Sequence, residues 1–376
     1  MEVLVINSGS SSIKYKLFEM SPFAKASGDY PPKPNAKAIW RRRMPQERTV
    51  SKGIIEHIGE KGSKIRDHYA GLKIILGKIE HVGIVGHRVV HGAEKFRRPV
   101  LINESVIKNI RQCCSIAPLH NPANLAGILA CKKLLPGIKQ VAVFDTAFHQ
   151  TLSDYAYIYG LPYAYYKRFG IRKYGFHGTS HEYVAGEAAR IIHKPLNKLK
   201  IITCHLGNGC SITAIDKGKS CDTSMGFTPL EGLIMGTRCG DIDPALVTYI
   251  MKKKRFNIHQ IDDILNKASG LKGISGLSND MRVLASKARM GNKRAQLAIN
   301  VFIYRIKKYI GAYTAIMGGC DVLVFTAGIG ENQKRIREAI CQGIFSHLKR
   351  KPRILVIPTD EELLIARKTY QLIQER

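Results

Sequence analysis

Four short stretches of the chain carry side chains that could bind or transfer a phosphoryl group, and three of the four also contain glycine. GHRVVHG carries Arg88, VFDTAFH places Asp145 directly after an apolar run, YGFHGTSH carries His177, and MGTRCGDIDP carries Arg238. An arginine guanidinium can bind a phosphate or carboxylate through two parallel hydrogen bonds. Arginine and histidine donors, acting with a metal ion, stabilise the charge on a phosphoryl group during transfer. Each residue could be structural by itself, but the set favours phosphoryl transfer.

Two glycine-containing turns could hold the phosphates of a nucleotide. In NSGSSSIK, the side chains of Ser10, Ser12 and Lys14 would face a phosphate chain or its metal ion, because the N–H groups of such turns form an anion-binding concavity. In HLGNG, Gly207 and Gly209 allow close approach of the backbone. The chain has no Walker A sequence, so a nucleotide would need a different device. A plain polar hairpin is the alternative interpretation.

A third glycine stretch, FTAGIGEN (residues 325–332), follows the apolar run 322–324. It fails as a Rossmann fingerprint because the third glycine is absent. We therefore expect a glycine platform against an adenosine, with an ordinary strand-to-helix turn as the alternative. In PLHNP, His120 stands directly before a predicted helix start and is a further candidate for substrate contact.

The elements that must position these residues alternate between strands and helices. Residues 3–18 and 201–215 each read as an apolar strand, a small-residue turn and an alternating strand. Ser12-Ile13 and Ser211-Ile212 follow the two turns at the same place. This internal similarity predicts two related α/β domains that face a shared cleft.

Capping residues and helical spacing of apolar residues also predict several helices. Asn121 is predicted as an N-cap ahead of proline, with Leu125, Ile128 and Leu129 on one face. Thr179 and Glu182 have capping-box spacing. Helical spacing of apolar residues predicts a long helix over 294–317 and another that begins after Asn332 and includes Ile336, Ile340 and Ile344. Residues 21–50, with several prolines and no clear period, predict a long loop.

Composition sets further bounds. A chain of 376 residues is long enough for about two domains. Nine scattered cysteines without a Cys-x-x-Cys pair argue against a disulfide framework or structural zinc. The sequence shows no secretory leader and no apolar run long enough for a membrane span, so we expect a cytoplasmic protein. The net charge of +30 is interpreted as a solvated basic surface or the habit of a basic proteome, and it would also favour anionic substrates by steering. Nucleic-acid binding through Arg41–Arg43 is left open as a minor alternative.

Taken together, these motifs closely resemble those of the acetokinase family, in the superfamily of sugar kinases, Hsp70 and actin. The resemblance runs through nearly the whole chain, in order through NSGSSSIK, GHRVVHG, APLHNP, VFDTAFHQ, YGFHGTSH, HLGNG, DTSMGFTPLEG, GTRCGDIDP, GISGLSNDMR and FTAGIGEN. It implies an α/β fold of two ribonuclease-H-like (actin-like ATPase) domains with a catalytic cleft between them. It also implies reversible, Mg²⁺-dependent transfer of a phosphoryl group from ATP to acetate, giving ADP and acetyl phosphate, with Mn²⁺ as an alternative ion.

The resemblance also implies roles for matching residues. Asn7 and Glu361 would handle the magnesium ion, and Asp145 would be the essential catalytic carboxylate. Arg88 would contact the acceptor carboxylate, and His177 and Arg238 would stabilise the transition state. The ATP-binding residues would be Lys14, His205, Leu206, Gly207, Asn208, Gly209, Asp280, Met281, Arg282, Gly328, Ile329, Gly330, Glu331 and Asn332, beside Ser10 and Ser12 of the first turn.

The implied domains are residues 1–147, joined by a C-terminal helix over 360–376, and residues 148–359, which would carry most of the nucleotide site. A homodimer is expected. A small apolar pocket would select the acceptor, and we expect its lining to be Val90, Leu119, Phe176 and Pro229. The nearest alternative is a kinase for propionate or butyrate, and a more distant one is a chaperone-like or filament-forming ATPase on the same fold. Ala93, Cys210, Cys239 and residues 21–50 depart from the family pattern.

Overall fold

The computed structural model describes residues 1–21, 46–346 and 348–375. The chain divides into two compact units. Unit 1 comprises Met1–Gln150 and Asp360–Arg376, and unit 2 comprises Thr151–Thr359. The Arg41–Arg43 run lies outside the described residues. Among the described helices, none combines the length and the apolar character needed to cross a membrane.

Unit 1 is built on a six-stranded sheet with the order β3-β2-β1-β4-β6-β5. The predicted first hairpin is confirmed, because β1 (Glu2–Ser8) and β2 (Ile13–Ser21) pair antiparallel. β3 (Gln46–Ile55) pairs antiparallel with β2, whereas β4 (Ile84–Val89) and β6 (Gln140–Phe144) continue the sheet parallel to β1. The short β5 (Val100–Leu101) closes the far edge. The loop predicted over 21–50 is therefore wrong for Ser21, which ends β2, and for residues 46–50, which belong to β3. Residues 22–45 lie outside the described residues.

The sheet of unit 2 repeats this plan. β7 (Lys200–Leu206) and β8 (Cys210–Asp216) form the second predicted hairpin, and β9 (Lys219–Thr223) extends it antiparallel. β10 (Val322–Thr326) pairs parallel with β7, and β11 (Arg353–Val356) pairs parallel with β10. The order β9-β8-β7-β10-β11 thus matches β3-β2-β1-β4-β6 in sequence and direction. The predicted ribonuclease-H-like fold of both units is confirmed.

The internal similarity differs in one detail from the prediction. Ser12 lies in its turn, before β2 begins, whereas Ser211 lies within β8 and pairs with His205. The second turn is shorter, so the Ser-Ile pairs do not occupy equivalent strand positions. The Ser211 hydroxyl consequently lies beside histidine side chains.

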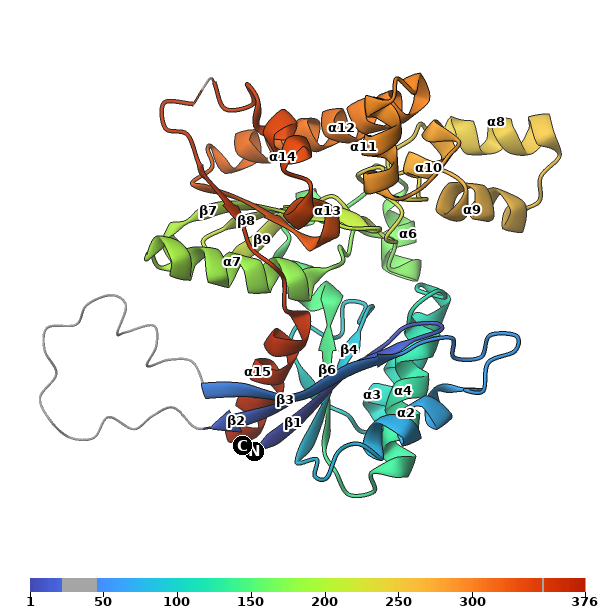
Figure 1. The fold of residues 1–376 in the computed structure, drawn as a ribbon, viewed down its shortest axis with the longest axis vertical. Helices are drawn as coiled ribbons and strands as arrows, with labels where there is room; N and C mark the ends of the chain where they lie inside the picture. Colours follow the sequence, from blue (N-terminus) through green and yellow to red (C-terminus); the bar gives the residue numbers. More distant parts are fainter. Residues whose placement is uncertain (22–45, 347, 376) are drawn as a thin grey trace, which may run out of the picture. The chain divides into compact units, whose positions relative to one another are not determined.

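The two faces of the unit 1 sheet bury alternate residues of β1. Leu4 and Ile6 pack in a cluster beneath α2 (His68–Leu76) and α4 (Asn121–Leu134), whereas Val3 and Val5 pack against α15 (Glu361–Gln374) on the opposite face (Figure 1). α3 (Glu104–Gln112) and the single turn η1 (Cys113–Ser115) pack beside α4. The unit is therefore a three-layer α/β/α structure.

Helix α15 packs closely against the rest of unit 1. Its Ile365, Ala366 and Tyr370 complete the apolar cluster on the Val3 face. Gly86 in β4 makes this approach possible, because a Cβ there would lie 2.5 Å from Thr369 Oγ1 and 3.0 Å from Ile365 Cγ2. The sheet face over β1 and β4 is thus covered by a helix from the far end of the sequence.

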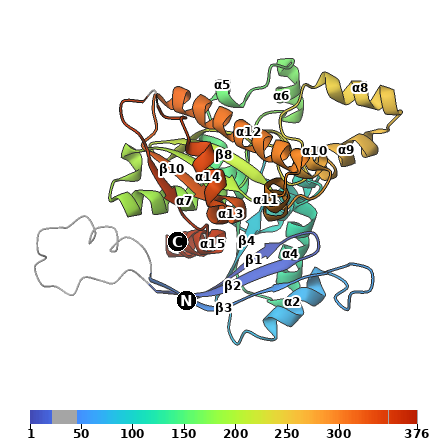
Figure 2. The same cartoon turned by 45° about the horizontal axis from the view of Figure 1, so that its top comes forward.

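In unit 2, α7 (Gly178–Ile192) and the long α12 (Lys293–Met317) lie on opposite faces of the sheet (Figures 1 and 2). The predicted helix over 294–317 is confirmed. The remaining helical segments are η2 (Asp145–Thr151), which links the units, α5 (Asp154–Tyr157), α6 (Tyr163–Phe169), η3 (Leu196–Lys198), α8 (Ala245–Lys254), α9 (Ile258–Lys267), α10 (Gly270–Ser275), α11 (Met281–Arg289), α13 (Ala327–Asn332) and α14 (Lys334–Cys341).

Three helix boundaries correct the sequence predictions. α4 begins at Asn121 itself with His120 as N-cap, and Leu129 is 38% exposed rather than on the buried face. α7 begins at Gly178 after His177, which has a left-handed φ of 55°, so the capping box predicted from Thr179 is wrong. α14 ends at Cys341, so Ile344 lies beyond it.

Candidate functional site

In unit 1, three of the predicted residues contact the guanidinium of a fourth, Arg88. Arg88 is the penultimate residue of β4, Asp145 follows β6 directly, Asn7 lies near the end of β1, and Glu361 begins α15. The carboxyl ends of parallel strands meet at one edge of a sheet, which is where α/β proteins place their sites. We call Asn7, Arg88, Asp145 and Glu361 the Arg88 cluster.

Hydrogen bonds fix the geometry of the Arg88 cluster. Arg88 Nη2 donates to Asp145 Oδ2 at 2.6 Å, and Arg88 Nε lies 3.1 and 3.2 Å from the two Asp145 oxygens. Arg88 Nε also lies 3.3 Å from Glu361 Oε2, and Nη1 lies 3.5 Å from Asn7 Oδ1. The guanidinium is therefore oriented by two carboxylates and an amide.

Burial governs the charges of this cluster. Asp145 is 1% exposed. Burial raises the pKa of Glu361 to about 7, and the Asp145 charge adds to this effect, while Arg88 and Lys14 oppose it. Burial also works against the charge on Arg88, but Asp145 and Glu361 outweigh it and raise the pKa of Arg88, so the guanidinium stays ionised.

The donor chemistry of the cluster fits a magnesium ion. Mg²⁺ binds oxygen ligands and is usually held by one or two carboxylates, with water and substrate phosphates completing its shell. Asp145, Glu361 and Asn7 offer two carboxylates and an amide oxygen. Among the described residues, no group of three or more His, Cys, Asp or Glu side chains is placed to hold a metal alone. The set therefore suits an ion that shares its coordination with a bound phosphate.

The turn between β1 and β2 is held by a hydrogen bond to a side chain that sequence reasoning did not single out. The N–H of Gly9 donates to the carbonyl of Ser12 at 2.8 Å, and His68 Nε2 contacts the Gly9 carbonyl at 2.8 Å. His68 begins α2, so this helix braces the turn. The side chain of Lys14, at the start of β2, is exposed.

Two buried asparagines of α4 position the segment after Arg88, and sequence reasoning missed the role of both. Asn121 accepts from the His91 N–H at 3.0 Å and donates to the His91 carbonyl at 2.9 Å. Asn124 accepts from the Val90 N–H at 3.0 Å and donates to the Ser8 carbonyl at 2.8 Å. The spacing Asn-Pro-x-Asn at a helix start was the available signal, because buried amides must be hydrogen-bonded.

The residues expected to line the acyl pocket have different environments. Val90 is 8% exposed and Leu119 is 50% exposed, both in unit 1. In unit 2, Phe176 is 2% exposed, and the carbonyl of Pro229 accepts from Arg238. His120 caps α4.

In unit 2, His177 and Arg238 converge above Gly209. A Cβ on Gly209 would lie 3.3 Å from Cε1 and 3.4 Å from Nε2 of His177, and 3.4 Å from Nη1 of Arg238. Arg238 Nη1 donates to the Pro229 carbonyl at 3.3 Å and lies 3.6 Å from Met235 Sδ. Burial lowers the pKa of Arg238, but an arginine remains charged at neutral pH. The His177 imidazole and the Arg238 guanidinium thus lie next to the same stretch of backbone, at Gly209, which has no side chain to separate them from a ligand.

A polar network holds the loop that carries Arg238. The Asp241 carboxylate accepts from the Gly232 N–H at 2.7 Å and from the Tyr309 hydroxyl at 2.6 Å. Tyr159 donates a short hydrogen bond to Glu231. Burial raises the pKa of Glu231 and, together with Asp241, that of Tyr309. Asp241, which belongs to the Arg238 motif, is therefore a brace for this loop.

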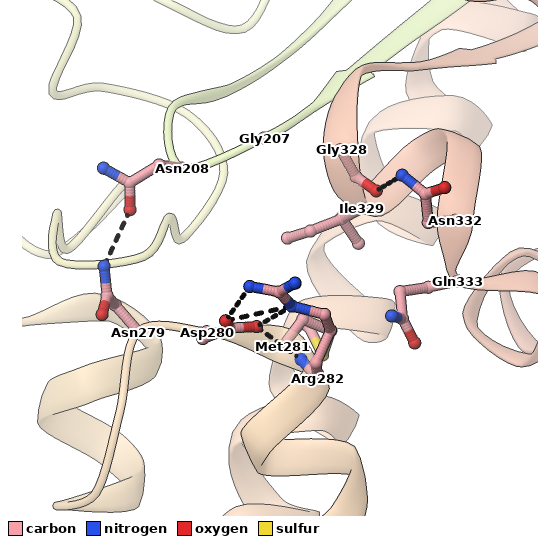
Figure 3. Close-up of a pocket in the computed structure, with 10 residues that line it drawn as sticks. All are labelled: Gly207, Asn208, Asn279, Asp280, Met281, Arg282, Gly328, Ile329, Asn332 and Gln333. Carbon is pink, nitrogen blue, oxygen red and sulfur yellow. Dashed lines mark hydrogen bonds and ion pairs between the residues drawn. The ribbon is translucent and has the colours of Figure 1, made fainter.

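A cavity of about 620 Å³ lies beside the second glycine turn (Figure 3). Eight of the predicted ATP-binding residues line it, namely Gly207, Asn208, Asp280, Met281, Arg282, Gly328, Ile329 and Asn332, together with Asn279 and Gln333, which were not predicted. Asn279 Nδ2 donates to Asn208 Oδ1 at 3.1 Å, and Arg282 pairs with Asp280 at 2.6 Å. Segments from three separate parts of the sequence thus form one recess.

Other predicted ATP-binding residues of unit 2 do not line this cavity. Leu206 is fully buried, and Gly330 is buried against Cys204 and Leu206. Glu331 Oε1 accepts from the Ala327 N–H at 2.8 Å and so stabilises the start of α13. His205 stacks on His177 with ring centroids 4.2 Å apart. Leu206, Gly330 and Glu331 therefore support the segments that line the cavity, and His205 belongs to the surroundings of His177.

Comparison with known sequences gives one family. The family model described as the Acetokinase family matches residues 2–349. An acetate kinase of Halothermothrix orenii is 49% identical, with all of both chains covered. An acetate kinase of Carboxydothermus hydrogenoformans is 45% identical, with 99% of both chains covered.

Solved structures agree. The crystal structure of Porphyromonas gingivalis acetate kinase is 40% identical with a TM-score of 0.85, and 99% of both chains is covered. A propionate kinase from Francisella tularensis is also 40% identical, with a TM-score of 0.83, covering 98% of this chain and 99% of that one. An acetate kinase from Entamoeba histolytica is 34% identical with a TM-score of 0.82, over the whole of both chains.

Proposed function

Because the chain belongs to the acetokinase family, whose members transfer a phosphoryl group between ATP and a carboxyl group, we propose that it is a Mg²⁺-dependent acetate kinase. In this proposal ATP and acetate give ADP and acetyl phosphate by direct, reversible, in-line transfer. The observation that carries it is the Arg88 cluster, in which a charged guanidinium lies at a strand end between the buried carboxylate of Asp145 and the partly buried carboxylate of Glu361.

Unit 1 is proposed to hold the acceptor. Arg88 would contact the carboxylate of acetate or the phosphate of acetyl phosphate, since a guanidinium matches both. Asn7 and Glu361 would hold the magnesium ion and Asp145 would orient it or its water. When bound, the ion would neutralise charge on the phosphate oxygens. His120, at the start of α4, is proposed as a further contact of the substrate.

Unit 2 is proposed to carry most of the nucleotide site. The cavity beside Gly207 is large enough for an adenosine, and backbone from α13 forms one wall. Lys14 and the hydroxyls of Ser10 and Ser12, in unit 1, would face the phosphates. His177 and Arg238 would donate to the phosphoryl group in transfer.

No strong general base is needed in this reaction. Acetate is already ionised at neutral pH, so the nucleophile exists before it binds. The obstacle is repulsion between two anions, and positive or hydrogen-bond-donating groups reduce it. Arg88, Arg238 and His177 are the groups of this chain that would do so, and Asp145 would act as a positioning carboxylate.

A longer acceptor is the second candidate, since a propionate kinase is as similar to this chain as one of the acetate kinases. The test is kcat/KM for acetate, propionate and butyrate with the purified enzyme. We expect acetate to be preferred. One methylene group changes kcat/KM by only about 10- to 200-fold in an apolar pocket, so discrimination between these acids will be partial. A higher kcat/KM for propionate would contradict acetate as the substrate.

A homodimer is also proposed. Large apolar side chains are exposed on helical segments of unit 2, including Tyr163 and Phe169 on α6 and Tyr249 on α8, which are 57%, 63% and 62% exposed. Exposed apolar patches are typical of protein interfaces. Light scattering of the purified chain should give twice the mass of one chain, and a monomer at micromolar concentration would contradict this.

A further inference from the structure

A chain of four hydrogen-bonded side chains runs through unit 2 to His177. Thr203 Oγ1 lies 2.7 Å from His181 Nδ1, and His181 Nε2 lies 2.7 Å from Ser211 Oγ. Ser211 Oγ lies 2.9 Å from His177 Nδ1. Thr203 and Ser211 come from the adjacent strands β7 and β8, whereas the two histidines are four residues apart at the start of α7 and share one face of it.

The environment of Thr203, at the far end of this series of hydrogen bonds, sets the direction in which each hydroxyl or imidazole donates. Thr203, His181 and Ser211 are each fully buried. Among the residues that the structure describes, the Thr203 hydroxyl has one hydrogen-bond partner, His181 Nδ1. A threonine hydroxyl always carries one proton to donate, and a buried donor without an acceptor is costly. The Thr203 proton therefore points at His181 Nδ1, which must be an acceptor.

The donor and acceptor of each remaining hydrogen bond in the series then follow. A neutral imidazole that accepts at Nδ1 carries its proton at Nε2, so His181 donates to Ser211 Oγ. Ser211 Oγ has imidazole nitrogens as both its hydrogen-bond partners within the described part of the chain, and its own proton is left to donate to His177 Nδ1. His177 must then carry its proton at Nε2. The opposite direction would leave the buried Thr203 proton without an acceptor.

We propose that Thr203, His181 and Ser211 are positioning residues that hold His177 as the neutral Nε2–H tautomer. His177 Nε2 lies beside Gly209, as does Arg238 Nη1. The chain would thus present an N–H donor at the point where the guanidinium also donates, and both would address an oxygen of the transferring phosphoryl group. The role of the donor in transfer rests on the function proposed above, but the tautomer does not.

The tautomer can be measured directly. Two-bond ¹H–¹⁵N spectra of the ¹⁵N-histidine-labelled enzyme distinguish a protonated from an accepting ring nitrogen, and loss of one signal set in His177→Gln assigns that residue. In the wild type at neutral pH we expect His177 to have Nε2 protonated and Nδ1 accepting. A His177 protonated at Nδ1, alone or with Nε2, would overturn the proposal without any variant.

Variants test the source of the tautomer. Thr203→Val keeps the side-chain shape but removes the donor, and we expect the His177 signals to shift toward a mixture of tautomers. Thr203→Ser should restore the wild-type spectrum. Thr213→Val is the matched control, because Thr213 is equally buried on β8 but pairs with Thr223 at 2.9 Å, outside the chain of four. Unchanged His177 signals in folded Thr203→Val would contradict the proposal.

Kinetics separates this inference from the proposed function. Thr203→Val should lower kcat about fivefold, the effect of one neutral hydrogen bond, with little change in KM for acetate or ATP, and Thr203→Ser should recover it. A rise in KM with an unchanged kcat would indicate a merely structural role and contradict the positioning role. If His177→Gln kept full activity while the tautomer was as expected, the proposed role of His177 in transfer would fail and the hydrogen-bond assignment would stand.

Discussion

At the scale of single residues, the two arginines of the candidate site have opposite surroundings. Arg88 is paired with Asp145 and Glu361, whereas Arg238, within the described residues, has no salt bridge and donates to a carbonyl and contacts a thioether sulfur. A partly buried cation without a counter-ion gains most when an anion arrives. Arg238 is therefore the better candidate for binding charge that develops in the proposed reaction, while Arg88, already oriented by two carboxylates, suits the proposed contact with the acceptor.

Replacing Arg238 tests this difference. Arg238→Ala should lower kcat by about 10²–10³, the cost of losing one transition-state donor. It should not lower the thermal stability, because it removes a partly buried cation for which the described residues offer no salt bridge. Steady-state kinetics and a thermal melt on the same preparation are the measurements. A variant with wild-type kcat would remove Arg238 from the mechanism.

Gly209 gives a second test at this scale. Gly209→Ala places a methyl group 3.3–3.4 Å from His177 and Arg238, in the space where the phosphoryl group would approach. We expect kcat to fall at least about tenfold with the fold retained, a loss typical of a displaced transition-state donor. Gly186→Ala, on α7, is the matched control because a Cβ there meets nothing within 4 Å, and it should leave activity unchanged. Equal activity in the two variants would show that nothing approaches Gly209 closely.

The side-chain types of the site could be predicted from sequence, but their pairing could not. Arg88 and Asp145 are 57 residues apart, and Glu361 is far beyond both. Nothing local specifies that one guanidinium spans both carboxylates, because that depends on β4, β6 and α15 meeting. The same holds for Ser211, whose position on β8 rather than in the turn became clear only from the strand register.

At the scale of elements, β4 shows how strand alternation separates a residue of the candidate site from a residue of the core. Arg88 reaches the site, while its neighbour His87 is buried and contacts Gln140 Oε1 at 2.7 Å. Burial lowers the pKa of His87 from 6.5 to about 4, and burial has the same effect on the pKa of His91. The folded protein therefore disfavours the protonated forms of both.

This predicts a loss of stability in acid. Because the pKa of His87 is lower in the folded state, its contribution to the free energy of unfolding is present above pH 6.5 and is lost as the pH falls toward 4. The amount is about 3 kcal/mol for a shift of this size. His87→Gln keeps an amide donor for Gln140 and should flatten the dependence of stability on pH across that window.

Urea unfolding at a series of pH values between neutral and about 4 measures the effect. His81→Gln is the control, since His81 is 73% exposed and pairs with Glu2 at the surface. It should follow the wild-type curve. If His87→Gln loses as much stability as the wild type between pH 6.5 and 4, then the neutral form of His87 is not what the fold requires.

Elements with strong periodicity were predictable, and elements fixed by tertiary contacts were not. The two hairpins and α12 follow from alternation and from helical spacing. The start of α7 was misplaced because His177 adopts a left-handed conformation, which is uncommon for residues other than glycine and which the sequence around His177 does not signal. β3 was missed because its first residues follow a proline-rich stretch, and its pairing with β2 decides its conformation.

At the scale of the whole molecule, the two units have the same strand order but different proposed tasks. ADP should protect amides of unit 2 from hydrogen exchange, most strongly over residues 207–209, 279–282 and 328–333, which include the cavity lining. Acetate alone should protect residues 86–91 of unit 1. Protection by ADP that is strongest in unit 1 would contradict the assignment of the nucleotide to unit 2.

Helix α15 gives the molecule an order of assembly. Unit 2 is continuous in sequence, so a ribosome delivers all of it before α15 is made, and domains generally fold as they are completed. Unit 1 must wait with Val3, Val5 and Ile84 uncovered until Ile365 and Tyr370 arrive. The same helix brings Glu361, so the step that closes this core also supplies the last member of the Arg88 cluster. A nascent chain should therefore fold unit 2 first and complete the Arg88 cluster only when the strands of unit 1, made before unit 2, receive a helix that is made after it.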